Sequence, residues 1–563
     1  MKTAAATLAV LLLALPAAAD RVLTKDGRVL HPKKARAEGS GYRFVFENGE
    51  IVVADKAVVS SVEIEGDMSE YVPQNDDERE KLAQGYVKYK GKWLSKPAYE
   101  GELRREFEAS RKRTEELAKH SDWSNAWSKE TKHFVVQSNT SPELLDYYCE
   151  LMEAYYSLMD ERIGINPSPT MRRTKLAVNI FKSRDEFREL SDWGEGSMPG
   201  GVIGFFSPMG KSLNFFHDYE DPDRTTWVGL HECTHLLTFL VDQQYRPQIW
   251  VNEGVADYFG SSKVGRDAKG KIVITPGELQ TDRVLTVQQA IAASRGKAPA
   301  TGDAGNGEET GGPKGPKKKR EGRKSTTLEE LFMMPREKFD GFEYAHAWSF
   351  VYFLNNFEGG KYAKPFARFF KGLYSLEKPL KVDTSGGGKS VSPQDIRAYL
   401  LSKLGLKDTV ELEKQWKDFV AAVPIEGPTA RLKRGLSSVR QLEFEDALDD
   451  LDAAIAGGTQ DPRAWWARGR ALAATGKRKQ AQEDLAKAVL LEPLNAGFRY
   501  ELSRLMSGRI TLLSSDGGGI KIVESDEQKK IQNPEARVHA GLATELDPEN
   551  DSFREWFDRF EAP

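Results

Sequence analysis

Apolar and polar residues alternate along the first part of the chain, between residues 20 and 66. A period of two places successive side chains on opposite faces of a β-strand. Asp26-Gly27 and Asn48-Gly49 interrupt the alternation, and both dipeptides are typical of tight hairpin turns. We therefore predict four or five short strands in a small β-barrel-like module. Its residues do not assemble a chemical site, so we interpret it as a docking or spacer module.

Residues 67–125 combine a second hairpin with a charged helix. The hairpin is predicted at 86–93 and the helix from about Pro97 to Ala118. Charges on such a helix usually face solvent, so we interpret it as a connecting helix.

Strand and helix patterns alternate in the longest segment, residues 126–425. Strands are predicted at 134–137 and 175–181, and helices at about 142–163 and 184–190. This alternation predicts a mixed sheet packed on helices.

A 34-residue period appears beyond residue 426 and predicts an α-helical repeat array over residues 426–563. Small and apolar residues recur in the same order: Gly435, Ala447, Leu451 and Ala454 correspond to Gly469, Ala481, Leu485 and Ala488. The pattern resembles the tetratricopeptide repeat, in which small residues let paired helices pack closely. A third copy is predicted between Phe498 and Leu546, with a Gly-rich insertion at about 514–519. The array either presents a concave surface to a peptide or protein partner or caps the preceding domain.

Length and composition agree with a multidomain α+β protein, because 563 residues exceed what one hydrophobic core usually spans. The formal net charge is −4, and neither sign is concentrated on a predicted folded segment, which argues against nucleic-acid binding. The only cysteines, Cys149 and Cys233, exclude a disulfide framework and leave a single bridge possible.

Residues 1–19 have the pattern of a secretory signal peptide. Lys2 precedes a short apolar run, and small residues stand before Asp20. The run is too short to span a bilayer comfortably, although an uncleaved anchor is the alternative. No later segment has eighteen apolar residues in succession. We expect an exported protein, periplasmic or extracellular, without a transmembrane segment in the mature chain.

Residues 297–325 form an unusual insertion within the 126–425 segment. They are rich in glycine, proline and like charge, with a basic run at 314–320. Such a composition predicts a disordered loop. We interpret it as a solvated insertion, and a tether to an anionic polymer or membrane surface is the alternative.

The residues that carry chemistry gather in two adjacent predicted helices. His231 and His235 are four residues apart, so both lie on one helix face and can bind a single metal ion. Glu253 on the next helix supplies a third ligand, as in catalytic zinc sites that keep a fourth position open. Asp257, one turn further on, is placed to fix the tautomer of His231. The pattern predicts Zn²⁺ as the cofactor.

Glu232 lies beside the first ligand, turned off the metal-binding face of the helix. There it can act as a general base on the attacking water and then as an acid toward the leaving amine. Cys233 falls on the opposite face, so we predict a buried apolar side chain there and not a ligand. The strand predicted at 211–216 would be nearest this helix. An open edge at this strand would bind an extended peptide, and a covered edge is the alternative.

These motifs resemble the gluzincin clan of metallopeptidases, in which His-Glu-x-x-His precedes a glutamate ligand on the next helix and an aspartate four residues later. Residues from about 131 to 373 are also similar to the peptidase-MA-like domain of a family of exported bacterial proteins. The further motifs that carry this similarity are 131–136, 200–206 and 344–350. The resemblance implies a thermolysin-like catalytic domain.

The same resemblance implies that Tyr344, on a later helix, stabilises the oxyanion. The alternative is an aromatic side chain packed under the site. His346 would face elsewhere on that helix, and we interpret it as structural.

From these features we predict an exported zinc metallopeptidase that acts on a protein or peptide. One alternative is a scaffold that uses its repeats and retains a vestigial zinc site. Another is an amidase that acts on a cell-wall or other non-peptide bond. No fourth histidine or cysteine lies near the motif, although structural zinc sites usually have four protein ligands, and this favours an enzyme.

Overall fold

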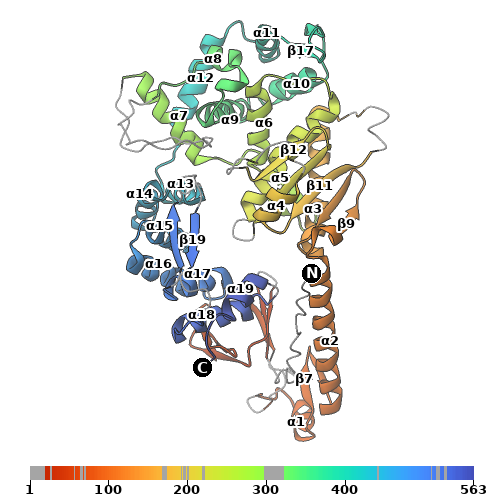
Figure 1. Cartoon of the computed structure of the whole chain (residues 1–563), viewed down its shortest axis with the longest axis vertical. Helices are drawn as coiled ribbons and strands as arrows, with labels where there is room; N and C mark the ends of the chain where they lie inside the picture. The colour runs from red at the N-terminus through yellow and green to blue at the C-terminus, as the bar shows by residue number, and fades with distance from the viewer. Residues whose placement is uncertain are drawn as a thin grey trace, which may run out of the picture. The chain divides into compact units, whose positions relative to one another are not determined.

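The computed structural model describes the chain from residue 20 to residue 562 with gaps (Figure 1). The residues left out are 1–19, 26–27, 56–57, 64–67, 69–70, 166, 168–173, 192, 194–197, 199–201, 219–221, 297–322, 441–442, 509, 515–519, 525–528, 549 and 563. The predicted signal peptide, the Asp26-Gly27 turn, most of the basic insertion, part of the 200–206 motif and the Gly-rich segment 515–519 therefore lie outside the described residues. The described chain is mixed α and β, with several small sheets and many helices.

The chain divides into two compact units that do not follow the predicted domain boundaries. One unit is drawn from residues 1–116, 459–513 and 521–563, and the other from 117–458 and 514–520. The predicted 426–563 array is thus divided between the two units. The connecting helix α2 (Lys96–His120) runs across the first boundary.

The N-terminal module of the first unit contains two antiparallel three-stranded sheets. The strand order of one sheet is β2 (Val29–Leu30), β1 (Arg21–Thr24), β6 (Val59–Glu63). The strand order of the other sheet is β3 (Lys34–Glu38), β4 (Gly41–Val45), β5 (Glu50–Val53). Asn48-Gly49 forms the predicted turn between β4 and β5. The small β module is confirmed, but its described strands do not close into a barrel.

C-terminal helices complete the hydrophobic core of this module. The helices are α17 (Ala496–Met506), α18 (Pro534–Leu546) and α19 (Asp551–Phe557). The shared core includes Val22, Phe44 and Ile51 from the strands, and Leu542, Leu546 and Phe553 from α18 and α19. The Glu545 carboxylate accepts hydrogen bonds from the backbone N–H groups of Glu47 and Asn48, each at 2.9 Å. The module is therefore one side of a common core and not a free spacer.

Leu542→Ala is expected to destabilise the first unit by about 2–5 kcal/mol, because it leaves a cavity between the strands and α18. Leu542 is 1% exposed, whereas Leu490, on another helix of the same unit, is 70% exposed and offers a matched control. Denaturant unfolding and limited proteolysis of the β module measure the effect. If both leucine variants behave alike, the common core is not important for stability.

Three helix pairs correspond to the predicted repeats. They are α13 (Pro428–Arg440) with α14 (Phe444–Ala456), α15 (Pro462–Ala474) with α16 (Arg478–Leu491), and α17 with α18. The strands β18 (Ile510–Ser514) and β19 (Ile520–Glu524) form a two-stranded sheet between α17 and α18, at the position predicted for an insertion.

Each of the first two pairs has the same internal contacts, at positions 34 residues apart. Arg434 contacts Asp450 at 2.7 Å, and Arg468 contacts Asp484 at 2.7 Å. Gly435 is pressed against Leu451 so closely that a Cβ atom there would lie 2.5 Å from its side chain. The sequence period is thus matched by equivalent packing within each pair.

The first unit also contains the predicted hairpin and most of the predicted connecting helix. Its elements are α1 (Asp76–Ala83), β7 (Val87–Tyr89), β8 (Lys92–Leu94) and α2. Lys90 and Gly91 both have positive φ at the turn of the hairpin, as a two-residue turn of type I′ requires.

A five-stranded mixed sheet organises the second unit. Its order is β12 (Gly204–Ser207), β13 (Ser212–Phe216), β11 (Leu176–Phe181), β10 (Phe134–Ser138) and β9 (Trp127–Glu130). The three central strands are parallel, and the two edge strands are antiparallel to their neighbours. The predicted mixed sheet is confirmed.

Of the two alternatives for the strand at residues 211–216, an open edge and a covered one, the structure shows the covered strand. β13 pairs with β11 on one side and with β12 on the other, so β12 is the edge strand. Asn214 is fully buried, and its side chain accepts a hydrogen bond from Asn179 at 2.9 Å. A short turn connects β12 to β13, and β12 pairs with the edge of β13 that β11 does not cover.

Helices pack on this sheet and on one another. The helices that matter for the site are α3 (Pro142–Ile163), α5 (Pro222–Val241), α6 (Ile249–Gly260), α7 (Thr281–Ser294) and α9 (Gly341–Asn356). The others are α4 (Arg184–Leu190), α8 (Leu328–Met333), α10 (Ala363–Tyr374), α11 (Pro393–Leu404) and α12 (Thr409–Ala422), with the strand pairs β14 (Lys263–Arg266) and β15 (Ile272–Thr275), and β16 (Val382–Asp383) and β17 (Ser390–Val391). Figure 1 shows α3 and α5 lying along the strands. Among the described helices, none combines the length and the apolar character needed to cross a membrane.

Candidate metal centre

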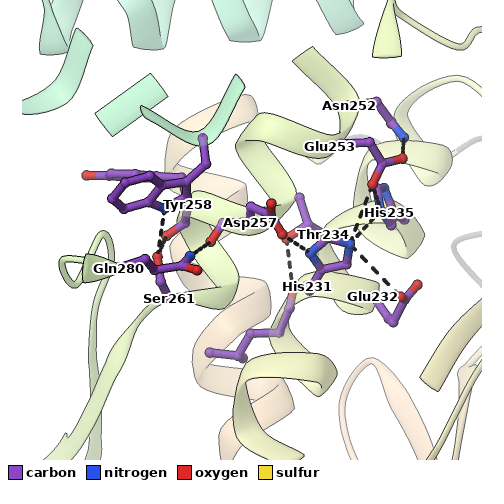
Figure 2. Close-up of polar contacts among 12 residues, drawn as sticks. His231, Glu232, Thr234, His235, Asn252, Glu253, Asp257, Tyr258, Ser261 and Gln280 are labelled. Atoms are coloured by element: carbon purple, nitrogen blue, oxygen red, sulfur yellow. Dashed lines mark hydrogen bonds and ion pairs between the residues drawn. The ribbon is translucent and has the colours of Figure 1, made fainter. Parts of the chain in front are cut away.

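Two packed helices, α5 and α6, bring three potential metal ligands together. His231 and His235 are one turn apart on α5, and their Nε2 atoms are 3.2 Å apart. Glu253 lies on α6, with Oε2 at 3.6 Å from His231 Nε2 and 3.5 Å from His235 Nε2. Figure 2 shows the two imidazoles and this carboxylate facing one another. The structure therefore contains the triad that the sequence predicts.

The spacing of these three atoms suits one small metal ion. All three ligand atoms lie within 4.8 Å of one another. Zinc bonds of roughly 2.0–2.2 Å at the tetrahedral angle would separate two ligand atoms by about 3.4 Å. The observed separations of 3.2, 3.5 and 3.6 Å bracket that value. Among the described residues, no fourth histidine, cysteine or acidic residue joins the set.

Glycine in α6 allows the surrounding helices to approach closely. A Cβ atom at Gly254 would lie 2.9 Å from the carbonyl oxygen of Ala347 on α9. The residue next to Glu253 must therefore be glycine for α9 to pack directly on α6. This packing brings the beginning of α9, with Tyr344, toward the triad.

His231 and Glu253 are buried, His235 is half-buried, and the charges of the three side chains affect one another. Burial alone would lower the pKa of His231, but Asp257 and Glu253 outweigh it and raise that pKa well above its ordinary value. Burial would raise the pKa of Glu253, but His235 and His231 hold it well below the usual range. A metal ion would replace the proton on this set, because metals bind neutral imidazole and ionised carboxylate.

Asp257 occupies the position predicted for orienting His231. Its Oδ1 lies 3.0 Å from His231 Nδ1, and the residue is 1% exposed. Its Oδ2 lies 2.8 Å from Arg283, a residue that the sequence analysis did not single out. Arg283 comes from α7, 26 positions after Asp257 and outside any motif, so no local pattern could have found it.

The other oxygen of Glu253 has two further neighbours. Asn252 Nδ2 donates to Oε1 at 3.0 Å, and Arg336 lies 3.8 Å from the same atom. Neither residue was predicted. Because Oε1 has these contacts, Oε2 is the oxygen that Glu253 presents to the two histidines.

Glu232 lies beside the triad but turns toward the sheet. Its Oε1 is 4.0 Å from His231 Nε2, and its Oε2 accepts the backbone N–H of Phe206 in β12 at 2.9 Å. Burial raises the pKa of Glu232, whereas the two histidines oppose that rise and Glu253 adds to it. A carboxylate with a raised pKa at this position is suited to taking up a proton and releasing it again.

Tyr344 lies in the first turn of α9 and is half-buried. Burial raises the pKa of its hydroxyl, and the carboxylates of Glu253 and Asp257 add to that rise, so the hydroxyl stays protonated and can donate. The Phe339 ring packs against it at a centroid distance of 5.0 Å. These contacts agree with both predicted roles, an oxyanion donor and an aromatic packed under the site.

His346 is structural, as predicted. It is fully buried, and its Nδ1 lies 2.8 Å from the carbonyl oxygen of Phe342, one turn earlier in α9. Its Nε2 lies 3.3 Å from the Ser325 hydroxyl. Burial lowers the pKa of His346 to about 4.

Both cysteines are buried and free, so no bridge joins them. Cys233 is fully buried on α5, as predicted for an apolar position. Burial raises the pKa of Cys149 to about 11 and that of Cys233 further. Both thiols therefore stay protonated at neutral pH, and neither belongs to the described ligand set.

Comparison of the chain with protein-family models, with curated proteins and with solved structures finds no match. The functional argument consequently rests on the geometry of the site.

Glu343, next to Tyr344, is expected to make stability depend on pH. It is 1% exposed, and burial together with Asp340 raises its pKa to about 7, although Arg323 lies at 2.6 Å. Between about pH 4.5 and pH 7, Glu343 therefore holds a proton in the folded protein, whereas the same residue has lost it in the unfolded chain. This contribution to stability is complete below about pH 4.5 and disappears as the pH rises through about 7.

Glu343→Gln should remove this pH dependence, because the amide is neutral at every pH. Melting temperatures of the metal-free protein at pH 5 and pH 8 provide the test. The wild type should lose more stability than the variant between these values. Equal losses would contradict the assignment of the raised pKa to Glu343.

Proposed function

We propose that the protein is a zinc-dependent hydrolase that cleaves peptide bonds. The observation that carries this proposal is the combination of three protein ligands at zinc spacing with a carboxylate, Glu232, that is close to the site but is not one of the ligands. A purely structural site would normally be closed by four protein ligands and would have no need of Glu232.

The side chains around the metal position have complementary roles in such a reaction. When bound, zinc supplies Lewis acidity, which makes water a nucleophile near neutral pH and polarises a carbonyl group. Glu232 accepts a proton from the attacking water at its carboxylate and transfers it to the leaving nitrogen. Tyr344 donates its hydroxyl hydrogen toward the oxygen of the attacked carbonyl.

The edge strand β12 supports a peptide as the substrate. Phe206 directs its N–H away from β13 and toward Glu232, so the outer edge of β12 lies beside the site. An extended peptide that paired with this edge would run past Glu232 and the metal ligands. The peptide-binding edge proposed here is thus β12, in place of the strand 211–216.

We further propose that the second unit is a gluzincin-type, thermolysin-like domain and that the helix pairs are tetratricopeptide-like. The ligand order, the mixed sheet next to α5 and the 34-residue spacing of equivalent contacts support these assignments.

The test is metal-dependent cleavage of an unbiased peptide library by the chain beginning at Asp20. Zinc content is measured first, and a chelator followed by zinc re-addition should abolish and restore cleavage. Stoichiometric zinc without cleavage of any peptide would favour a scaffold or a non-peptide substrate. Absence of zinc binding would overturn the proposal.

A further inference from the structure

We infer that Arg283 is a positioning residue of the metal centre, acting on His231 through Asp257. The inference rests on the proposed metal site. It adds a third helix, α7, to the two that supply the ligands.

The Asp257 carboxylate has an ion-pair neighbour at each of its two oxygens. Oδ2 lies 2.8 Å from an Arg283 Nη atom, and Oδ1 lies 3.0 Å from His231 Nδ1. Figure 2 shows Asp257 facing His231 from α6. The ion pair with the guanidinium at one oxygen favours the carboxylate orientation in which the other oxygen faces the imidazole. Arg283 thereby fixes the direction in which His231 presents Nε2 to the metal.

Arg283 is itself held in place. Its Nε donates to Gln280 Oε1 at 2.8 Å, and Gln280 Nε2 donates to the backbone carbonyl oxygen of Asp257 at 3.4 Å. The start of α7 is also fastened on its other side, where Ser437 of α13 donates to Asp282 at 3.1 Å. The guanidinium therefore has little freedom to leave Asp257, and its side chain is only 18% exposed.

Charge gives the second reason for Arg283. Three carboxylates, Glu232, Glu253 and Asp257, surround the two histidines. Arg283 is the less exposed of the two arginines that face these carboxylates, because Arg336, 3.8 Å from Glu253, is 73% exposed and Arg283 is 18% exposed. Without Arg283 the buried Asp257 would lose its permanent cationic partner, which is costly in a site shielded from water.

The competing explanation is that the Arg283–Asp257 ion pair only stabilises the packing of α7 on α6. Such an ion pair would affect the stability of the metal-free protein without changing the zinc affinity of the folded protein. A positioning residue changes zinc affinity, and it does so only while Asp257 is a carboxylate. The two roles therefore differ in a double-mutant cycle.

The experiment measures the zinc dissociation constant of the folded chain from Asp20 by competition with a chromophoric chelator. The variants are Arg283→Met, Asp257→Asn and the double variant, with Arg283→Lys to retain the charge without the planar fork. Arg266→Met is the matched control, because Arg266 forms an exposed ion pair with Glu150 at 2.7 Å in the same unit.

Arg283→Met should raise the dissociation constant about 10–100-fold. In the Asp257→Asn background the same change should have an effect of about two-fold or less. Arg283→Lys should lie between the wild type and Arg283→Met. If Arg283→Met does not fold, the cycle is completed with Arg283→Lys and its double variant.

Equal fold-changes in both backgrounds, or an Arg283→Met value like that of Arg266→Met, would overturn the inference. This readout is independent of catalysis. A wild type that binds zinc but cleaves no peptide would contradict the proposed function and leave the inference about Arg283 standing. Cleavage that persists with an unchanged zinc affinity in Arg283→Met would contradict only the inference.

Discussion

Glu232→Gln is expected to retain zinc and to lose peptide hydrolysis by about 10²–10⁴-fold in kcat, the usual contribution of a general acid–base. Glutamine has nearly the same shape, and its side-chain oxygen can still accept the N–H of Phe206, so the fold should be preserved. The amide cannot accept a proton from water at neutral pH. Because Glu232 is not one of the three ligand residues, zinc content should be unchanged.

Steady-state kinetics on a peptide identified in the library and zinc analysis of the same samples test this prediction. Glu150→Gln is the control, since Glu150 is exposed in its ion pair with Arg266. A Glu232→Gln variant that cleaves at the wild-type rate would show that another group carries the proton. A variant that loses zinc as well would assign Glu232 to metal binding.

His235→Ala is expected to remove stoichiometric zinc. In zinc-finger peptides, which bind zinc with four protein ligands, the binding free energy is about 10–16 kcal/mol. The average for one ligand is therefore roughly 2.5–4 kcal/mol, or about 10²–10³-fold in affinity. His235 supplies one of only three protein ligands, so its loss cannot be compensated within the triad. Zinc should also raise the melting temperature of the wild type but not that of the variant, because only the wild type binds it tightly.

Isothermal titration with zinc and thermal melts with and without the ion measure these effects. His31→Ala is the matched control, since His31 is exposed and belongs to the other unit. If His235→Ala binds zinc as the wild type does, the ion is held elsewhere in the chain. The proposed centre would then be wrong, even if the protein were a zinc enzyme.

The part of the site that follows helical periodicity was predictable from the sequence. His231 and His235 share a face of α5 because four residues make slightly more than one turn, and Cys233 is buried for the same reason. The spacing of Glu253 and Asp257 likewise places both on one face of α6. The contact partners of these residues were not predictable when they come from other elements, as Arg283, Arg336 and the N–H of Phe206 do.

The sequence by itself determined the elements whose signals are local. Alternation and turn residues defined the strands of the β module, the hairpin at Lys90-Gly91 and the mixed α and β character. The 34-residue period defined the helix pairs. These features depend on backbone geometry and on neighbours a few residues away, so they can be recognised without knowing the fold.

Only the tertiary structure decided which surfaces meet. It placed β12 on the edge of β13, left the β module as two sheets, and filled the core of that module with Leu542 and Phe553 from the far end of the chain. It also brought α7 against α6, so that Arg283 meets Asp257. Apolar faces and charged side chains are not specific to one partner. Their pairing depends on how the whole chain buries its apolar surface, and a local pattern does not contain that information.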